Sequence, residues 1–370
     1  MSRVALVLAS STGGIGRHVA SLAAGLSGRG AAVTVLGPPA TQVRFDFTGL
    51  GARFVPIEVA GAAGTLALRR ELARLRPDVI HAHGLRAGLA AGLARPGGVP
   101  LVVTWHNGLV HGGLGGRLRR LTEGQVARRA DVLLGASDEL VERGRAVGGR
   151  DVRLGPVAAR DLPAPARDRA AVRAELGLAE RGLAELSLAD GPPLLLSVGR
   201  LHPHKGYDVL VEAAARWRTR TPAPVVAIAG TGPAYLDLAR LISHRRAPVL
   251  LLGHRDDVSD LLGAADLALV TSVLEARQMF AQETLRAGVP LVATAVGGLP
   301  ELVGDAAVLI PPRDVDALDA AVTALLDDPV RRAELARRGP LRAADWPTEA
   351  QVVDQIQALY AELTGQPAER

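Results

Sequence analysis

Short apolar runs alternate with longer alanine- and leucine-rich stretches along most of the chain. The runs predict β-strands, and the stretches between them carry apolar residues at helical spacing. In the first half, this pattern places strands at 4–9, 32–36, 79–82, 101–104 and 132–136, and helices at 16–28 and 66–75, with Ser137 as the cap of another helix. Strands that alternate with helices predict a parallel sheet covered by helices on both faces.

The alternation weakens in a proline-rich segment between Pro156 and Pro193 and then restarts. The second half has predicted strands at 194–198, 225–229, 249–252, 267–270, 291–293 and 307–310, and helices at 207–216, 235–243, 258–264 and 281–287. We therefore predict two Rossmann-like, doubly wound α/β domains, at 1–165 and 193–345, with a linker region at 166–192. Residues 346–370 hold a last predicted helix at 348–363, expected to pack back on a domain, with the N-terminal one as the candidate.

The composition fits this organisation. A chain of 370 residues exceeds the size that a single core usually serves. Hydrophobic residues make up 48% and charged residues 22%, which excludes a mostly disordered chain. Cysteine is absent, so disulfides, thiolate metal sites and cysteine nucleophiles are excluded. The bias towards alanine, glycine and arginine is typical of GC-rich coding and points to a bacterial, actinobacterial source.

The expected location is cytoplasmic, with peripheral contact at the inner face of the membrane as an option. Residues 1–8 read as a first strand and not as a secretion signal, and no stretch approaches the roughly 20 apolar residues that span a bilayer. The net charge of +5 comes mostly from scattered arginines. It fits anionic ligands or an anionic membrane surface without singling out either.

Three segments that follow predicted strands are candidates for chemistry, because ligands of such sheets bind outside the carboxyl ends of the strands. The first is glycine-rich, Ser-Thr-Gly-Gly-Ile-Gly-Arg-His at 11–18. Its glycines, Gly14 and Gly16 among them, would let the backbone approach a phosphate at a helix N-terminus. A tight strand-to-helix turn explains the same glycines, and the sequence leaves both interpretations open.

The second segment, Ser-Val-Gly-Arg-Leu-His-Pro-His-Lys-Gly at 197–206, places two cations between a strand and a helix. Arg200 can make bidentate contacts and Lys205 acts as a point charge, a combination that suits a diphosphate. A solvated basic loop is the alternative. The sequence by itself does not decide between them.

The third segment, Glu-Ala-Arg-Gln-Met-Phe-Ala-Gln-Glu at 275–283, leads from a strand into a helix. It puts Glu275 in the loop and Glu283 in the first turns of the helix. A carboxylate that accepts two hydrogen bonds suits a ribose diol. Taken alone, either glutamate is also explained as a helix-capping or surface charge.

Five motifs, read in order, carry a resemblance. They are Gly-Gly-Ile-Gly at 13–16, Gly-Arg-Leu-His-Pro-His-Lys-Gly at 199–206, Gly-Thr-Gly-Pro at 230–233, the pair Glu275 and Glu283, and Ala-Val-Gly-Gly-Leu-Pro-Glu at 295–301. Together they resemble the retaining glycosyltransferases of family 4, which have the GT-B fold, two Rossmann-like domains facing across a cleft. The likeness covers nearly the whole chain and is more specific in its C-terminal half.

The resemblance implies roles for the second and third segments. Arg200 and Lys205 match residues that bind the diphosphate of a nucleotide-sugar donor, and Glu283 matches the residue that binds its ribose. Glu275 matches a glutamate beside the donor sugar. Gly199 and Gly230 belong to the matching donor-binding motifs. The donor is a substrate, so no cofactor is implied, and the N-terminal domain would bind a hydroxyl acceptor.

Further roles are implied in the N-terminal half. Gly14 and Gly16 match a loop that closes over the donor, and His106 matches a histidine near the reacting sugar carbon. A histidine satisfied within a loop is the alternative for His106. His18, His81 and His83 also lie near predicted strand ends, and the sequence does not rank them.

One departure from the family pattern concerns the donor. A small-then-aromatic pair usually follows the first glutamate, whereas this chain has Ala276 and Arg277. Arg277 is expected to add a cation for donor or acceptor, or to point to solvent.

The resemblance also implies that the anomeric configuration of the sugar is retained. This outcome implies a same-face reaction in which the leaving diphosphate helps to deprotonate the acceptor. No cluster of aspartates or histidines has metal-ligand spacing in the sequence, so no essential metal is expected.

Three other kinds of protein would also show parts of this sequence pattern. A sugar-nucleotide epimerase would have the same fold and use one substrate. A nicotinamide oxidoreductase would fit the glycine turn, but none of the three tyrosines (Tyr207, Tyr235 and Tyr360) is followed four residues later by lysine. A binding protein that lost catalysis would fit the departure at Ala276 and Arg277.

The acceptor, whether glycan, lipid or small molecule, is not identified by the sequence, and nucleic acid is not expected as a partner. Loops at 43–54 and 108–116 are expected to shape its site, because such loops vary on a fixed scaffold. Five arginines at helical spacing could touch an anionic membrane that carries a lipid acceptor, or form a solvated helix face: Arg117, Arg119, Arg120, Arg128 and Arg129.

Overall fold

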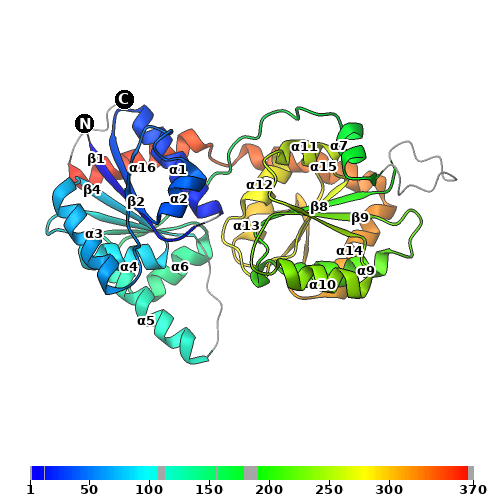
Figure 1. The fold of residues 1–370 in the computed structure, drawn as a ribbon, viewed down its shortest axis with the longest axis horizontal. Helices are drawn as coiled ribbons and strands as arrows, with labels where there is room; N and C mark the ends of the chain where they lie inside the picture. The colour runs from blue at the N-terminus through cyan, green and yellow to red at the C-terminus, as the bar shows by residue number, and fades with distance from the viewer. Residues whose placement is uncertain (1, 12, 107–112, 156, 179–190, 366–370) are drawn as a thin grey trace. The chain divides into compact units, whose positions relative to one another are not determined.

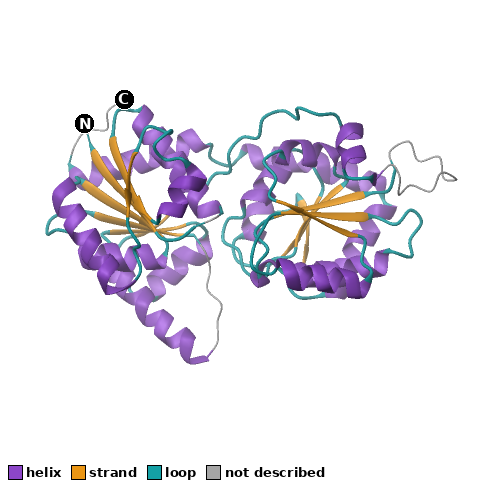
Figure 2. Cartoon of the chain, in the orientation of Figure 1, coloured by secondary structure: helices purple, strands orange, loops and turns teal. Residues whose placement is uncertain are grey.

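The structure is a computed structural model that describes residues 2–11, 13–106, 113–155, 157–178 and 191–365. The chain divides into two compact units (Figure 1). The first unit consists of Met1–Ala159 together with Pro347–Arg370, and the second of Arg160–Trp346. Each unit is built from one parallel sheet and its covering helices, as Figure 2 shows by secondary structure.

The sheet of the first unit has seven strands in the order β3-β2-β1-β4-β5-β6-β7, and all its ladders are parallel. The strands are β1 (Arg3–Leu8), β2 (Ala32–Gly37), β3 (Arg53–Pro56), β4 (Val79–His83), β5 (Leu101–Trp105), β6 (Val132–Gly135) and β7 (Val152–Leu154). The helices are α1 (Gly14–Gly28), α2 (Pro39–Phe45), α3 (Gly61–Leu75), α4 (Leu85–Ala94), α5 (Gly113–Arg129), α6 (Asp138–Ala146) and α16 (Glu349–Thr364).

The last helix, α16, completes the core of the first unit. Its apolar face, including Val353, Ile356 and Tyr360, packs with α1 and the sheet in one buried cluster. Figure 1 shows α1 and α16 on one side of this sheet and α3 and α4 on the other. Thr348 begins the helix through a capping box with Gln351, whose side chain bonds back to the Thr348 amide.

The sheet of the second unit has six parallel strands in the order β10-β9-β8-β11-β12-β13. The strands are β8 (Leu194–Val198), β9 (Val225–Ala229), β10 (Val249–Gly253), β11 (Leu267–Val270), β12 (Leu291–Thr294) and β13 (Ala307–Ile310). The helices are α7 (Arg169–Glu175), the short 3-10 helix η2 (Pro203–Lys205), α9 (Tyr207–Trp217), α10 (Tyr235–Arg245), α11 (Val258–Ala264), α12 (Met279–Arg286), α13 (Leu299–Val303), α14 (Val315–Asp327) and α15 (Pro329–Ala344).

Two buried clusters cover the faces of the second sheet. Residues of α7, α11, α12 and α13 form one cluster with the sheet, and residues of α9 and α14 form the other. Both sheets thus follow the doubly wound order in which two neighbouring central strands lead off in opposite directions. The predicted fold class, two Rossmann-like parallel α/β domains, is confirmed.

The structure contains elements that the sequence prediction did not place, among them α4, β7, α14 and α15. The segment 166–192, predicted as a linker region around one arginine-rich helical stretch, contains the helix α7. This helix packs on α11 as part of the second unit, and Arg173 donates to the Ala264 carbonyl at 2.9 Å. The segment 43–54, predicted as a loop, holds the end of α2 and the start of β3, with only the turn at 46–52 between them. The elements α2 and β3 have few buried positions, so their hydrophobic pattern shows no clear period.

Candidate functional site

The second unit brings two predicted segments together at its topological switch point. Strands β8 and β11 are neighbours in the sheet although two other strands separate them in sequence, and the loops that follow them meet. The Thr271 hydroxyl donates to the Lys205 carbonyl at 3.0 Å, and the Val273 amide donates to the His204 carbonyl at 2.8 Å. This edge of a doubly wound sheet is where ligands bind.

The Lys205 ammonium forms an ion pair with the Glu275 carboxylate. The two side chains are only 15% and 10% exposed, so the pair is largely shielded from water. The Ser272 hydroxyl donates to the same carboxylate oxygen of Glu275 at 2.8 Å, and the Ser272 carbonyl accepts from Thr294 at 2.5 Å. The second and third predicted segments therefore form one site.

Two glycines allow the loops of this site to pack closely. Gly206 has φ of +64°, and a Cβ there would lie 2.0 Å from the Thr271 carbonyl oxygen. At Gly230 a Cβ would lie 1.9 Å from the carbonyl oxygen of Gly199. A side chain at either position would separate the strand ends that hold Lys205, so glycine is required for the geometry of the site.

The other two residues predicted to bind the donor, Arg200 and Glu283, differ in exposure. Arg200 is exposed and forms no hydrogen bond or ion pair with other residues that the structure describes, so its guanidinium is available to an anionic ligand. Glu283 lies in the middle of α12 and is 4% exposed. The sequence left a surface charge as one alternative for Glu283, and a carboxylate this deeply buried does not fit it.

Arg277 lies on an aromatic ring and not in solvent. Its guanidinium carbon is 5.8 Å from the centre of the Trp346 ring, a cation–π contact. Burial lowers the pKa of Arg277 from its ordinary value, and Glu301 acts in the opposite direction. The neighbouring Gln278 caps α12 by accepting from the Ala281 amide at 2.7 Å. Arg277 thus has a structural role beside Trp346, and a donor contact of Arg277 stays a prediction.

One compositional signal was overlooked in the sequence. The chain has 43 lysine and arginine residues, and Lys205 is the only lysine among them. In a chain that uses arginine at every other basic position, the single compact ammonium lies in the candidate site. Lysine is a point charge with three rotatable donors, whereas arginine is a planar fork, so the two are not interchangeable in a tight site.

Tyr207 was also missed as part of this site. Its ring is buried, and its hydroxyl lies where a Cβ at Gly199 would approach it to 2.8 Å. Burial raises the pKa of the Tyr207 hydroxyl, and a hydrogen bond between Tyr207 and Ser197 opposes the rise. Tyr207 is therefore a neutral group, and its hydroxyl lies against the loop at Gly199.

In the first unit, the glycine-rich turn has a packing explanation. The Ser11 hydroxyl accepts from the Gly16 amide at 3.0 Å at the start of α1. A Cβ at Gly16 would lie 2.1 Å from the Phe45 ring of α2, so glycine lets the two helices approach. This contact favours the tight-turn interpretation for Gly16, and a donor role for Gly14 and Gly16 stays a prediction.

The carboxyl ends of β1, β4 and β5 carry a cluster of buried histidines. His83 ends β4 and His106 follows β5, and His83 Nδ1 lies 3.2 Å from His106 Nε2. The His18 ring, from α1, has its centre 5.2 Å from that of His106 and 5.6 Å from that of His83. Burial holds the pKa of His106 well below its ordinary value, and His18 and His81 lower it further. His106 is therefore a neutral imidazole at the ligand edge of its sheet.

A second pair of contacts ties this cluster to α16. His81 Nδ1 lies 2.6 Å from the Tyr360 hydroxyl, and His81 Nε2 lies 2.7 Å from the Thr104 hydroxyl. The His81 and His83 rings are 4.2 Å apart between centres. The C-terminal helix thus reaches the histidine cluster through one buried side chain.

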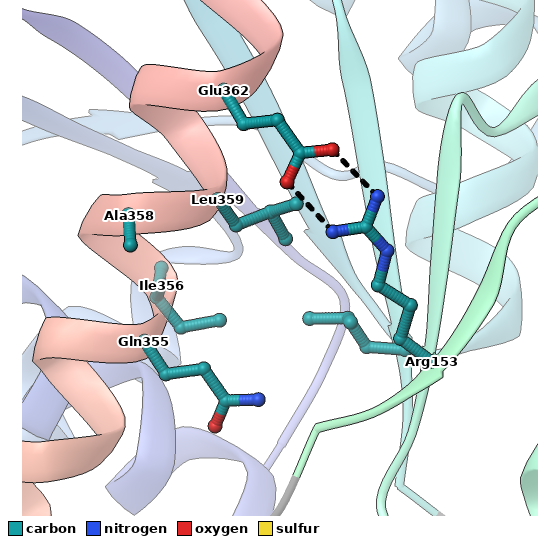
Figure 3. A pocket seen from close by; sticks show the side chains of 7 residues that line it. Arg153, Gln355, Ile356, Ala358, Leu359 and Glu362 are labelled. Carbon is teal, nitrogen blue, oxygen red and sulfur yellow. Dashed lines mark hydrogen bonds and ion pairs between the residues drawn. The ribbon is translucent and has the colours of Figure 1, made fainter. Parts of the chain in front are cut away.

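A cavity of about 250 Å³ lies elsewhere in the first unit, between α16 and strands β6 and β7. Figure 3 shows Arg153 and Glu362 at its edge, joined by two hydrogen bonds of 2.7 Å each. None of the predicted site residues lines it. The predicted acceptor segment 108–116 lies partly outside the described residues, which exclude 107–112.

The two sheets, with charged and polar loops at their switch points, define the class of Rossmann-like proteins that bind nucleotide-containing ligands. Two family profiles match this chain. "Glycosyl transferase 4-like domain" covers residues 13–159, and "Glycosyl transferases group 1" covers residues 181–342. The chain belongs to the glycosyltransferases of this family-4 type and has the GT-B fold.

Full-length relatives support this assignment. A protein described as glycogen synthase, from Mycobacterium tuberculosis, is 33% identical over 394 residues, which cover 93% of this chain and 90% of the relative. A D-inositol 3-phosphate glycosyltransferase from Geodermatophilus obscurus is 33% identical over 403 residues, covering 95% and 85%. The chain is thus an enzyme that transfers sugars.

Solved structures share the fold. HepE from Anabaena, in complex with UDP and glucose, is 20% identical with a TM-score of 0.81, over 98% of this chain and all of that one. Sucrose-phosphate synthase from Thermosynechococcus elongatus is 21% identical with a TM-score of 0.80, over 99% and 100%. Within the described residues, no helix combines the length and apolar character that membrane crossing requires.

Proposed function

We propose that this chain transfers a hexose-type sugar from a nucleoside-diphosphate sugar to a hydroxyl acceptor, with retention of the anomeric configuration. The observation that carries the proposal is the shielded ion pair of Lys205 with Glu275, beside the exposed Arg200, at the switch point of the second sheet. The similar protein HepE from Anabaena has been solved in complex with UDP and with UDP-glucose, which makes a uridine nucleotide the first donor to test.

Each donor residue has a distinct task in this proposal. Arg200 and Lys205 hold the diphosphate and stabilise the negative charge that grows on it as the sugar leaves. Such preorganised charge is worth several kcal/mol in other enzymes, about 2.7 to 4 for one lost donor group. Glu283 binds the ribose, and Glu275 positions Lys205 while lying beside the sugar.

Retention follows if the acceptor hydroxyl attacks from the face that the diphosphate leaves. The chain then needs no carboxylate nucleophile, because the departing phosphate oxygen takes the acceptor proton. His106 is neutral because burial lowers its pKa, so it can accept or donate one hydrogen bond near the sugar. No metal is required for any of these steps in the proposal, and activity should persist in EDTA.

The direct experiment is a panel of UDP-, GDP-, ADP- and dTDP-sugars tested for binding and for slow hydrolysis. We expect one nucleotide series to bind, and NMR of the first released sugar to show the anomeric configuration of the donor. Release of the opposite anomer would contradict retention. Conversion of the donor into an epimer without release would identify an epimerase, and binding without turnover under any condition would identify a binding protein.

The acceptor side carries a related proposal. Four of the five arginines of α5 are exposed (Arg117, Arg119, Arg120 and Arg128), and Leu121 beside them is 66% exposed. In a cytoplasmic enzyme with a lipid acceptor, these exposed cations and Leu121 would contact anionic headgroups. Flotation with anionic and with neutral vesicles tests it: the chain should float only with the anionic ones, and remaining at the bottom in both would contradict it.

A further inference from the structure

Three buried histidines converge at the ligand edge of the first sheet. His18 comes from α1, His83 from the last position of β4, and His106 from the residue after β5. Each offers one ring nitrogen, and the three nitrogens lie within 4.8 Å of one another. The residues are 4%, 2% and 8% exposed, respectively. Among the residues that the structure describes, this is the one group of three or more histidines, aspartates and glutamates at metal-binding distances.

The distances between these nitrogens suit the tetrahedral coordination of a metal ion. Zinc binds imidazole nitrogens at about 2.0 to 2.1 Å, so the edge of its ligand tetrahedron is about 3.3 Å. The contact between His83 Nδ1 and His106 Nε2, at 3.2 Å, already has this length. The three nitrogens lie within 4.8 Å of one another, so closing the third onto the same centre needs a shift of at most about 1.5 Å, which rotations of the rings can supply.

The ring of His83 has a further feature that favours a ligand. Its Nε2 atom is buried and has no hydrogen-bond partner among the described residues. A buried polar atom without a partner costs about 1 to 3 kcal/mol. Because nothing holds that nitrogen, the ring can present either nitrogen to an ion at the cost of only one hydrogen bond.

The histidines are also in the protonation state that metal binding requires. A metal ion needs the lone pair of a neutral imidazole. Burial lowers the pKa of His18 to about 4 and holds those of His83 and His106 well below their ordinary values. Protons therefore do not compete for the three nitrogens near neutral pH.

We propose that His18, His83 and His106 bind one divalent transition-metal ion, with zinc as the best chemical match, through three imidazoles and an open fourth position. Imidazole ligands suit zinc, copper, iron and nickel, and three protein ligands with an open fourth position are typical of catalytic zinc sites. The cluster contains no carboxylate, so the bound ion keeps its double positive charge and takes water, hydroxide or another anion in the fourth position.

The ion blocks sugar transfer, and this part rests on the proposed function. Binding ties up the ring nitrogen of His106 that would otherwise contact the substrate. The site is thus inhibitory, and it agrees with an enzyme that needs no metal. Zinc should inhibit transfer reversibly, and EDTA should restore it.

Cobalt titration of the whole, chelator-treated chain tests metal binding without any turnover. We expect one equivalent of Co²⁺ to give the intense visible absorption of tetrahedral cobalt, and Zn²⁺ to displace it. His18→Asn and His83→Gln should each weaken binding by about 100-fold or more, because loss of even an outer-shell partner costs about 10- to 100-fold. His244→Ala, at an exposed position, is the matched control and should bind as the parent does.

The rival site is the pair His202 and His204 in the second unit, whose Nδ1 atoms are 2.6 Å apart. If His202→Ala abolishes the cobalt signal and His18→Asn leaves it intact, the proposal is wrong. Thermal unfolding shows whether the variants fold. If they do not, X-ray absorption of the zinc-loaded parent counts its imidazoles: three agree with the cluster of three histidines, and two or fewer contradict it.

The outcomes separate this proposal from the proposed function. Sugar transfer with no metal binding would overturn the metal site and leave the transferase intact. The chain could show the tetrahedral cobalt absorption, lose it in His18→Asn, and transfer no sugar from any tested donor. That result would support the metal site and overturn the transferase proposal. Zinc that binds at the cluster without slowing transfer would overturn the inhibitory part alone.

Discussion

The Lys205 ammonium is ion-paired with the Glu275 carboxylate, across 70 residues of sequence, where the loops after β8 and β11 meet. The pair joins a cation expected to bind diphosphate to a carboxylate expected beside the sugar. The same carboxylate oxygen accepts from Ser272 at 2.8 Å, so Glu275 is held from two sides. These contacts orient the Lys205 ammonium before a donor diphosphate, as proposed, would bind to it.

Replacing Lys205 should abolish transfer without unfolding the protein. We expect Lys205→Ala to lower both sugar transfer and donor hydrolysis by about 100-fold or more, since loss of one preorganised donor to a developing charge has this effect. Lys205→Arg should fail similarly, because a planar guanidinium does not fit the space of an ammonium paired with Glu275. Steady-state kinetics and thermal unfolding measure the two effects.

The matched control is Arg240→Ala, which removes an arginine that is 79% exposed from the same unit. It should leave turnover unchanged, and near-normal turnover of Lys205→Ala would contradict the assignment. Since Lys205 is the only lysine, reductive methylation with an NMR-active carbon isotope labels that side chain and the terminal amine alone. Its signal should move when the nucleoside diphosphate is added.

Gly206→Ala should destabilise the second unit and impair the site. Gly206 has φ of +64°, and an added Cβ would lie 2.0 Å from the Thr271 carbonyl oxygen. The left-handed backbone costs an alanine about 1 to 2 kcal/mol, and the collision adds to that. Gly253→Ala separates the two effects, because Gly253 has φ of +70° with nothing within 4 Å of its Cβ position. Urea unfolding should show the larger loss for Gly206→Ala, and equal losses would argue against the close approach.

The sequence predicts the sheets well because their strands are buried on both faces. The apolar runs at 194–198, 225–229, 258–264, 267–270 and 307–310 have the bounds of β8, β9, α11, β11 and β13. Parallel strands covered by helices read as continuous apolar runs, and this signal is strong. The short elements α2 and β3 escape detection, since their few buried positions give no clear period.

The contacts of the candidate site are harder to predict than its residues. Each segment was found from the residues after a strand, but the pairing of Lys205 with Glu275 depends on β8 and β11 being neighbours, which sequence order does not reveal. Arg277 was expected at a ligand or in solvent, and the structure places it on Trp346, which is distant in sequence. The convergence of His18, His83 and His106 likewise depends on strand order.

Tyr360→Phe should loosen the attachment of α16 to the first sheet. The Tyr360 hydroxyl lies 2.6 Å from His81 Nδ1, and both side chains are buried. Removing the hydroxyl leaves the His81 nitrogen without that partner, which costs about 1 to 3 kcal/mol. Tyr235→Phe is the matched control, because Tyr235 is 46% exposed and should lose less than about 0.5 kcal/mol. Chemical unfolding measures both, and equal stability of the two variants would show that the Tyr360 contact is unimportant.

The first unit should lose stability between pH 6.5 and pH 4 because of its buried histidines. Burial lowers the pKa of His18 to about 4 and that of His81 to about 3, against an ordinary value of 6.5 in the unfolded chain. Between these values the unfolded chain binds protons that the folded chain does not, so stability rises with pH there and falls on acidification. Each such histidine contributes at most about 1.4 kcal/mol per pH unit within its window.

The stability from His18 is complete above pH 6.5 and is lost as the pH falls through about 4. Carboxylates such as Asp78, Asp257 and Asp260 have pKa values lowered by their arginine partners, and their contribution is lost only below the ordinary value of 3.8. The upper part of the histidine window, from pH 6.5 to about 5, therefore lies above the carboxylate window, which begins below the ordinary glutamate value of 4.5. Unfolding free energies measured in EDTA at successive pH values can separate the two. A His254→Ala control removes a half-exposed histidine and should keep the slope. A flat profile from pH 6.5 to pH 5 would contradict the neutral, buried state of the cluster.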